Sequence, residues 1–579
     1  MDRTTFNSIS HNISIIRKKL KSCYWQKSVI WLLLTGLILR LIIAFWLLPG
    51  YDEGYYYLYT RHLDWSYFDH PLLVALTTNF GVWITGITSL FTLRLGTVIL
   101  YTGTLWLLYL TSARLFDHQT AKLTLSIVSV VPIFNVGFGV ITLPDSPLIF
   151  FWTASLYCAA VEFFPNSNRN FYPTYRLAIL GILVGLTCLG KYHGFILGLG
   201  LIGFCLTSPP HRRVFLSRWT GLGIILYILT LFPLWFWNLN HDWISFRFQL
   251  LNRFESPPEG EISPSRYSLF NVFSIFLTEL GLLFPTIGIP LWWVVLRSSL
   301  SQLIRLFDDN LHIVSGKSQQ TFSEYNLAQK QLFILWVSLP LMLGFTLLGG
   351  KQQILVTWPI PGLWSGTLLL GFYSIQWKQQ SSNLIRWWIR GTGIITTIIL
   401  LLLLLHTTTG TFYKSSQYSP FGNFLTPKND PTKELIDIEQ LRKVFAESSE
   451  LMNALDETTF IFTNAYYLAG LIDLALRPLK NIPVTCFSYD MRGFIFWHDT
   501  NQWVGKDGLY ITLEQFHKMP HLKNDFSRYF EEFQEIGTVP ISLGGVVVNV
   551  FHVYKAKTFL KPYSLEESFL FYKNQSLVF

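Results

Sequence analysis

The feature that most constrains this chain is a series of apolar runs between residues 28 and 410. Most of them hold about 17 to 25 residues, the length that an α-helix needs to cross the hydrocarbon core of a bilayer. Only 14% of the 579 residues are charged, whereas soluble domains hold about 25%. Because backbone polar groups in lipid must be paired within their own segment, these runs predict a polytopic all-α membrane domain.

Composition divides the chain into three parts. Residues 1–27 form a predicted cytoplasmic N-terminus, residues 28–410 the membrane domain, and residues 411–579 a soluble domain. The first apolar run lacks a small-residue cleavage site, so we interpret it as a retained helix and not as a signal peptide. The predicted spans are 28–48, 94–113, 121–142, 146–162, 176–190, 192–208, 219–237, 269–296, 331–348, 354–375 and 386–410.

Segment 72–91 is long enough to cross, but it contains Asn79, two glycines and several hydroxyl side chains. If it does not cross, Lys and Arg concentrate on one side of the membrane; if it crosses, this bias disappears. The positive-inside rule therefore favours an in-plane or re-entrant helix on the outer face, with about 11 to 13 spans in total. This topology predicts an inner-membrane protein with a cytoplasmic N-terminus and an extracytoplasmic C-terminal domain.

The formal net charge of +9 lies largely in loops on the predicted inner side, so we do not interpret it as a nucleic-acid-binding surface. The chain contains no GxxxxGK[ST] motif, which argues against an ATP-driven pump. No predicted inner segment is long enough for a soluble domain that would use a nucleotide sugar. A donor available on the outer face, such as a polyprenyl-phosphate sugar, meets this condition.

The stretch PGYDEGYYYLYTRHLDWSYFDHPL, residues 49–72, places acids, imidazoles and aromatic rings directly after the first span. Residues 54–65 have the spacing of a helix that lies at the membrane interface. Asp52 and Glu53 then stand at its N-terminus. Asp52 is either a helix cap or a general base that takes a proton from a hydroxyl group at the membrane surface.

The sequences DEGYYYLYTRHLDWSYFDHPLL, RLFDHQTAK, TLPDSPLIFFW, GLTCLGKYHGF, NHDWISFRFQ and VTWPIPG resemble, in order, those of bacterial PMT_2-type membrane glycosyltransferases. These enzymes have the GT-C fold and are related to the aminoarabinose transferase of lipid A and the dolichyl-phosphate-mannose–protein mannosyltransferases. The resemblance covers most of the membrane domain. It implies a GT-C helical bundle with in-plane helices in the first external loop.

The resemblance also implies roles for several residues. Asp52 matches the catalytic acid of the first external loop, and Glu53 follows it as in the paired acids of the family, so both are candidate catalytic residues. Asp69 and His70 match an acidic–basic stretch, but Leu72 replaces the second proline of that stretch, which bears on any metal role of the pair.

Asp145 matches the acid of the second external loop, although flanking prolines also suit a helix start. With Asp52, Asp69 and His70, it is a candidate ligand of a divalent cation. The relatives differ in their need for metal, so the sequence leaves this cofactor open. Lys191 and the adjacent Tyr192 are candidate substrate-binding residues, because a lone lysine between apolar runs either snorkels or contacts a lipid-linked phosphate.

Arg253 resembles the arginine that relatives present to the donor phosphate, and its alternative is an exposed loop charge. Lys351, between two apolar runs, is a candidate of the same kind or a helix-end lysine. We expect both to bind substrate on the outer side.

The segment 411–579 predicts a small α/β domain with a mixed sheet. Its single cysteine, Cys486, excludes an internal disulfide. The predicted strands are 458–464, 483–489, 508–513 and 546–556, and the predicted helices are 432–454 and 466–476.

The sequence thus predicts an inverting membrane glycosyltransferase with a polyprenyl-phosphate sugar donor. The acceptor is a lipid, a glycan or a protein. The alternatives are a polytopic transporter or flippase of lipid-linked sugars, and an inactive relative that serves as an assembly subunit. A transporter would be expected to show internal repeats, and the sequence has no convincing repeat.

Overall fold

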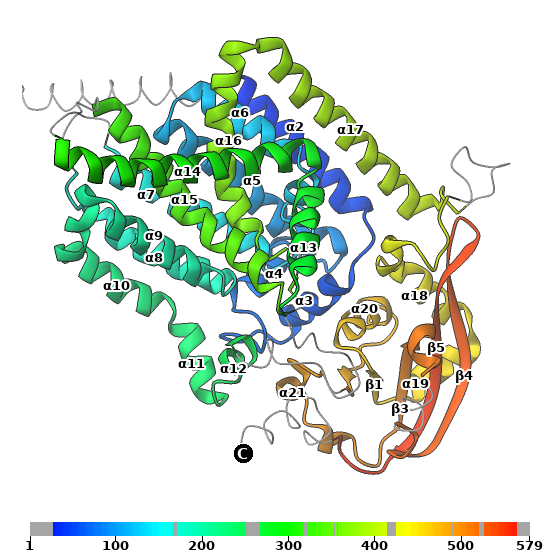
Figure 1. The fold of residues 1–579 in the computed structure, drawn as a ribbon. Coiled ribbons are helices and arrows are strands. Elements are labelled where there is room, and N and C mark those ends of the chain that lie inside the picture. Colours follow the sequence, from blue (N-terminus) through cyan, green and yellow to red (C-terminus); the bar gives the residue numbers. More distant parts are fainter. Residues whose placement is uncertain are drawn as a thin grey trace, which may run out of the picture.

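The computed structural model describes residues 27–165, 171–250, 267–315, 322–352, 354–355, 357–413, 424–488, 490–519 and 526–563. Two bodies are visible in Figure 1: a large helical bundle, and a smaller unit built around a sheet at the C-terminal end of the chain. The long helix α17 (Ser382–Thr409) runs along the edge of the bundle toward the sheet domain.

The bundle is built from helices that match the predicted apolar runs. Besides α17, its elements are α2 (Lys27–Trp46), α3 (Tyr51–Arg61), α4 (Leu73–Thr85), α5 (Leu90–Leu115), α6 (His118–Ser129), α7 (Asp145–Phe163), α8 (Arg176–Gly190), α9 (Gly194–Thr207), α10 (Arg218–Thr230), α11 (Phe232–Asn240), α12 (Ile244–Leu250), α13 (Leu269–Leu282), α14 (Pro285–Ser315), α15 (Phe322–Leu348) and α16 (Ile360–Gln380).

Among the described residues, 6 helices are long and apolar enough to cross a membrane, or up to 8 if each of two bent helix pairs is one span. Two of them, α2 and α17, bury only 22% and 11% of their most apolar windows within the protein. Their outward-facing leucines and isoleucines therefore suit a lipid environment. The chain is a multi-pass membrane protein, as predicted.

Helix α4 occupies the segment whose crossing the sequence left in question. Its 13 residues end at Gly86, which has a positive φ of 69°. A helix of this length is about 20 Å long, shorter than the roughly 30 Å hydrocarbon core, so α4 cannot span on its own. It packs closely on α5, because a Cβ added at Gly81 would lie 2.1 Å from the carbonyl oxygen of Thr92.

Three predicted spans are not continuous helices. The run 121–142 is α6 followed by a π-helical turn at Ile133–Gly137, the run 219–237 is the bent pair α10 and α11, and the run 269–296 is α13 and α14. Leu283 and Phe284 lie between α13 and α14, and Phe284 has a φ of 66°. Pro285 begins α14, and a proline suits this position because its fixed φ and missing N–H fit the first turn of a helix. The sequence carries a signal for this break, because the residue before a proline is disfavoured in a helix, but the hydrophobic run hid it.

The C-terminal domain is a mixed five-stranded sheet with the order β2-β1-β3-β5-β4, in which β1 pairs in parallel with β2 and β3 and the other pairs are antiparallel. The mixed sheet confirms the prediction. Its elements are α18 (Ile438–Glu447), α19 (Ser449–Glu457), β1 (Phe460–Thr463), α20 (Tyr466–Leu476), β2 (Val484–Cys486), α21 (Phe494–Trp497), β3 (Gly508–Leu513), α22 (Glu514–His517), β4 (Phe530–Leu543) and β5 (Val546–Phe559).

Two details of this domain differ from the prediction. The sequence analysis missed β4, whose glutamates, Gly537 and Pro540 are unfavourable in strands; β4 tolerates them because it is the edge strand. The predicted helix 432–454 is two helices, because the Ser448 side chain caps the start of α19.

The two bodies meet where α3 crosses α20. The helix predicted over 54–65 begins earlier, at Tyr51, and its middle is buried under the C-terminal domain. A Cβ added at Gly470 would lie 1.7 Å from the carbonyl oxygen of Gly54, so the two backbones touch. Next to this crossing, the Tyr57 hydroxyl donates to Asp473 Oδ2 at 2.6 Å.

We expect the substitution Gly470→Val to lower the stability of the protein, because the new side chain must push α3 away from α20. Overpacking of this kind costs about 1–3 kcal/mol. Thermal unfolding of the detergent-purified protein measures the effect. The control is Gly391→Ala in α17, where an added Cβ meets no described atom within 4 Å. An unchanged unfolding temperature in Gly470→Val would contradict the close crossing.

Candidate active site

The two acids at the start of α3 point in different directions, since neighbouring residues on a helix are separated by about 100°. The Asp52 side chain is exposed, whereas Glu53 is only 3% exposed. The residue that precedes α3 and occupies its N-cap position is Gly50, so Asp52 is not the helix cap.

Glu53 forms a buried bidentate ion pair with Arg94 of α5. Arg94 Nε donates to Glu53 Oε1 at 2.8 Å, and Nη2 donates to Oε2 at 2.6 Å. The same carboxylate accepts the backbone N–H of Gly50 at 3.3 Å and that of Thr142 at 3.1 Å. Nη1 of Arg94 in turn donates to the carbonyl oxygen of Leu47, in the chain just after α2, at 2.6 Å. The pair therefore ties α5, the end of α2, the start of α3 and the segment before α7 together.

Asp52 lies within an electrostatic cluster of residues from separate parts of the chain. Loss of hydration within the surrounding protein raises the pKa of its carboxyl group above the usual value, and Asp69 and Asp145 also raise it. Arg492 and Lys191 lower it. The carboxyl group of Asp52 is thus accessible to solvent although protein surrounds it, and a raised pKa makes its carboxylate a stronger base.

Lys191 and Asp145 form a second buried ion pair. Lys191 Nζ donates to both carboxylate oxygens of Asp145 at 2.9 Å, and each side chain is 8% exposed. Lys191 therefore does not snorkel toward an interface. Asp145 is the first residue of α7, but its carboxylate binds this ammonium group and does not cap the helix.

Asp69 is the centre of a third polar group. Its carboxylate accepts hydrogen bonds from the hydroxyls of Tyr55, at 3.2 Å, and Tyr59, and it pairs with Arg492 Nη1 at 2.9 Å. Arg492 comes from the C-terminal domain, and its guanidinium lies 3.7 Å from the centre of the Tyr466 ring. The C-terminal domain thus supplies a cation to the neighbourhood of Asp52.

The remaining predicted residues have different surroundings. His70 is buried, with its ring edge-on to Tyr56 at 5.6 Å. Tyr192 shares a short hydrogen bond with the Ser245 hydroxyl, which links the start of α9 to α12. Lys351 is exposed in the turn after α15. Arg253 lies outside the described residues.

The predicted metal ligands do not form a three-donor group. Within the described parts of the chain, the group of His, Cys, Asp or Glu side chains close enough to share an ion lies in the C-terminal domain and includes none of Asp52, Asp69, His70 and Asp145. Asp69 and Asp145 are each paired with a cationic side chain instead.

Sequence reasoning missed two residues of this region. Arg94 is the first residue of the predicted span 94–113. A charged residue at such a position is usually assigned to the membrane boundary, so nothing in the sequence indicates its ion pair. Arg492 stands in a stretch rich in aromatic and charged residues, YDMRGFIFWHD, and only the fold brings it to Asp69. Its positive φ of 47° sets it in a tight turn before α21.

The helical bundle and the appended sheet domain define a multi-pass membrane protein with a C-terminal α/β domain. A family model described as PMT_2, dolichyl-phosphate-mannose-protein mannosyltransferase, matches residues 69–237. Lipid A galacturonosyltransferase RgtD from Rhizobium johnstonii is 21% identical over 320 residues, or 55% of this chain. That alignment spans 59% of the relative's length.

Solved structures show the same fold. ArnT from Cupriavidus metallidurans in the apo state aligns over 91% of this chain and 97% of its own, with a TM-score of 0.55 and 12% identity. ArnT bound to undecaprenyl phosphate aligns over the same shares with a TM-score of 0.52 and 13% identity. The predicted GT-C fold and the resemblance to PMT_2-type, ArnT-like glycosyltransferases are confirmed.

We expect Glu53→Gln to destabilise the protein by about 3–5 kcal/mol, because it leaves the buried Arg94 without its counter-charge. The unfolding free energy in detergent measures the loss. The neighbouring substitution Asp52→Asn is the matched control, since Asp52 is exposed and makes no comparable pair. Equal stability of the two variants would contradict a structural role of Glu53.

Proposed function

We propose that the protein is an integral-membrane glycosyltransferase that moves a sugar from a polyprenyl-phosphate donor to a hydroxyl or phosphate of an acceptor. The single observation that carries this proposal is the position of Asp52. It is an exposed carboxylate with a raised pKa, surrounded by two cation–carboxylate pairs. A base next to cations suits a reaction that removes a proton and releases a phosphate.

In the proposed reaction, Asp52 takes the proton of the acceptor group, and the acceptor oxygen attacks the anomeric carbon of the sugar. The bond between this carbon and the phosphate oxygen breaks, and polyprenyl phosphate leaves with the bonding electrons. Lys191 and Arg492 stabilise the charge that develops on the leaving phosphate. In-line attack inverts the anomeric centre, as the family resemblance implies. The reaction as written uses side chains alone.

We assign a phosphate-binding role to Arg492 in addition to the one that the sequence predicts for Arg253, which lies outside the described residues. Its partial exposure of 20% and its stacking on Tyr466 support this assignment, because the guanidinium is held in place while one side stays open.

Glu53 supports the site in a different way. It is a positioning residue, since its buried pair with Arg94 fixes the turn that presents Asp52.

The donor and acceptor classes follow from the relatives. One solved relative holds undecaprenyl phosphate, and one relative in sequence is a lipid A galacturonosyltransferase. A polyprenyl-phosphate uronic acid and a lipid A-type acceptor are therefore the first substrates to test. The charge distribution of the loops supports an inner-membrane protein with this site on the outer face.

We expect purified protein to transfer radiolabelled galacturonic acid from polyprenyl phosphate to lipid A, and Asp52→Asn to lower the rate by about 10²–10⁴-fold, the usual effect of losing a general base. Scintillation counting of the extracted lipid measures the transfer. Asp117→Asn is the matched control: Asp117 caps α6 and accepts the N–H groups of Gln119 and Thr120, so this variant should keep full activity.

Equal transfer by wild type and Asp52→Asn would remove Asp52 from its role as base. The absence of transfer from any polyprenyl-phosphate sugar, combined with movement of the labelled lipid across proteoliposomes, would favour a flippase.

We also expect a pH signature of Asp52. Its folded-state pKa is raised, so the ionised group opposes folding at neutral pH, and this penalty disappears as the pH falls through the folded pKa toward the ordinary value of 3.8. Asp52→Asn removes the penalty. The variant should therefore unfold at the same or a higher temperature than wild type at pH 7, and the difference should vanish near pH 4. A lower unfolding temperature at pH 7 would contradict the assignment.

A further inference from the structure

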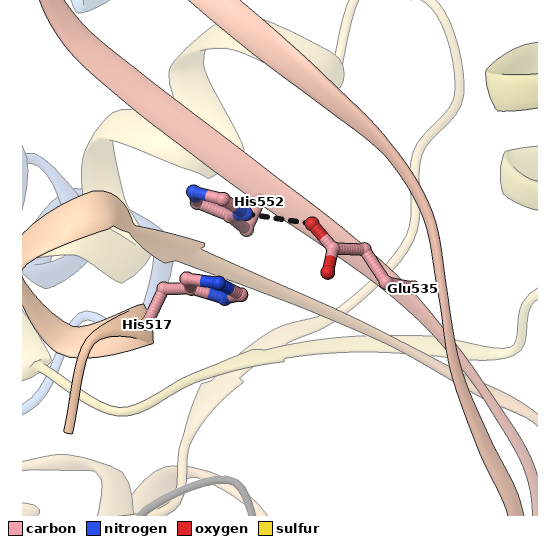
Figure 2. Close-up of side chains that lie close together, drawn as sticks. All are labelled: His517, Glu535 and His552. Carbon is pink, nitrogen blue, oxygen red and sulfur yellow. Dashed lines mark hydrogen bonds and ion pairs between the residues drawn. The ribbon is translucent and has the colours of Figure 1, made fainter. Parts of the chain in front are cut away.

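A second group of titratable side chains lies in the C-terminal domain, on residues that the proposed transfer reaction does not use. His517 ends α22, Glu535 lies on β4 and His552 lies on β5, so three separate elements contribute to it (Figure 2). One ligand atom from each of these residues lies within 4.8 Å of the others. We propose that the three side chains form a binding site for a divalent transition-metal ion of the zinc class.

The sheet register explains why these side chains meet. Residues two apart on a strand share a face, so His552 and Tyr554 project from the same side of β5. Glu535 pairs with Tyr554 across the hairpin and therefore stands on that side as well. Because α22 follows β3 directly, and β3 pairs with β5, His517 lies over the same patch with its ring parallel to that of His552 at 3.7 Å.

One ring nitrogen of His517 contacts a neighbouring side chain, whereas both ring nitrogens of His552 contact a carboxylate. The Tyr554 hydroxyl bonds Nδ1 of His517 at 2.6 Å, so Nε2 is the ligand atom that we assign. Glu514 bonds Nε2 of His552, and Glu535 Oε1 lies 2.7 Å from Nδ1 of the same ring. A carboxylate or hydroxyl that holds the outer nitrogen of a metal-binding histidine fixes its tautomer and raises its basicity.

The size and chemistry of the group suit zinc. Donors that are each about 2.1 Å from one ion lie at most about 4.2 Å apart, and the ligand atoms here lie within 4.8 Å of one another. Because the two imidazole rings are stacked in parallel and a ligating imidazole points its lone pair within its own plane, binding requires the rings to rotate relative to each other. Two imidazoles and one carboxylate are typical zinc ligands, whereas magnesium and calcium prefer oxygen alone. Water takes the fourth tetrahedral position. The ion would tie α22 to the β4–β5 hairpin.

A second interpretation of the same contacts is that His552 is protonated and that no metal binds. His552 contacts a carboxylate at each ring nitrogen, and a doubly protonated imidazolium would satisfy both. The two interpretations differ in metal stoichiometry, so the test needs only the full-length protein, EDTA treatment and Zn²⁺ alone.

We expect the EDTA-treated protein to bind one Zn²⁺ per chain by elemental analysis after dialysis, and its unfolding temperature to rise with the ion. Glu535→Gln and His517→Ala should each weaken binding at least 10-fold, and Tyr554→Phe about 10-fold through the lost outer contact. Co²⁺ in place of Zn²⁺ should give visible absorption of tetrahedral strength that Glu535→Gln abolishes.

Two variants serve as controls. Glu532→Gln, on the same strand but paired with Lys557, should bind Zn²⁺ as wild type does. Asp52→Asn should also leave binding unchanged, which separates this site from the proposed active site. The metal site would be overturned if the wild type did not retain stoichiometric Zn²⁺, or if Glu535→Gln and Glu532→Gln bound Zn²⁺ equally. Either result would favour a protonated His552 between its two carboxylates. Because Glu535→Gln keeps the size of the side chain, its metal-free unfolding temperature reports whether the fold is intact.

Discussion

The buried pair between Glu53 and Arg94 is the interaction on which the candidate active site depends. Two charges removed from water are costly unless geometry and hydrogen bonds compensate them. Here the guanidinium fork and the carboxylate match bidentately, and backbone groups from the end of α2, the start of α3 and the segment before α7 occupy the remaining positions. One ion pair therefore orients both the turn that carries Asp52 and the approach to Asp145.

The other charges follow a common rule: each cation near Asp52 has a carboxylate partner from a distant part of the chain. Lys191 is held by Asp145, and Arg492 is held by Asp69. In the proposed reaction the donor phosphate therefore binds to cations that are already oriented and partly neutralised. Little free energy is needed to reorganise such cations when charge develops on the leaving group. They also release the phosphate product more readily than unpaired cations would.

Hydrophobic length predicted the membrane domain, and short apolar runs predicted four of the five strands, three of which are buried along their whole length. The prediction failed where a local signal was weak or contradictory: α13 and α14 are separated by one residue of unusual backbone, and β4 carries Gly and Pro. Local sequence was enough to select Asp52, Asp145 and Lys191 as candidates, and the fold brings these three residues into one electrostatic cluster. The partners Arg94 and Arg492 could not be found, because their roles arise from packing between segments far apart in sequence.

The contact between Gly54 and Gly470 has a mechanical consequence. Asp52 lies half a helical turn from a point where two backbones touch and where Tyr57 is bonded to Asp473. Because the C-terminal domain contacts α3 at this point, it cannot rotate away from the helical bundle without displacing the carboxylate of Asp52. In the proposed reaction, access for the substrates then depends on movements of other elements, while the C-terminal domain keeps a fixed position.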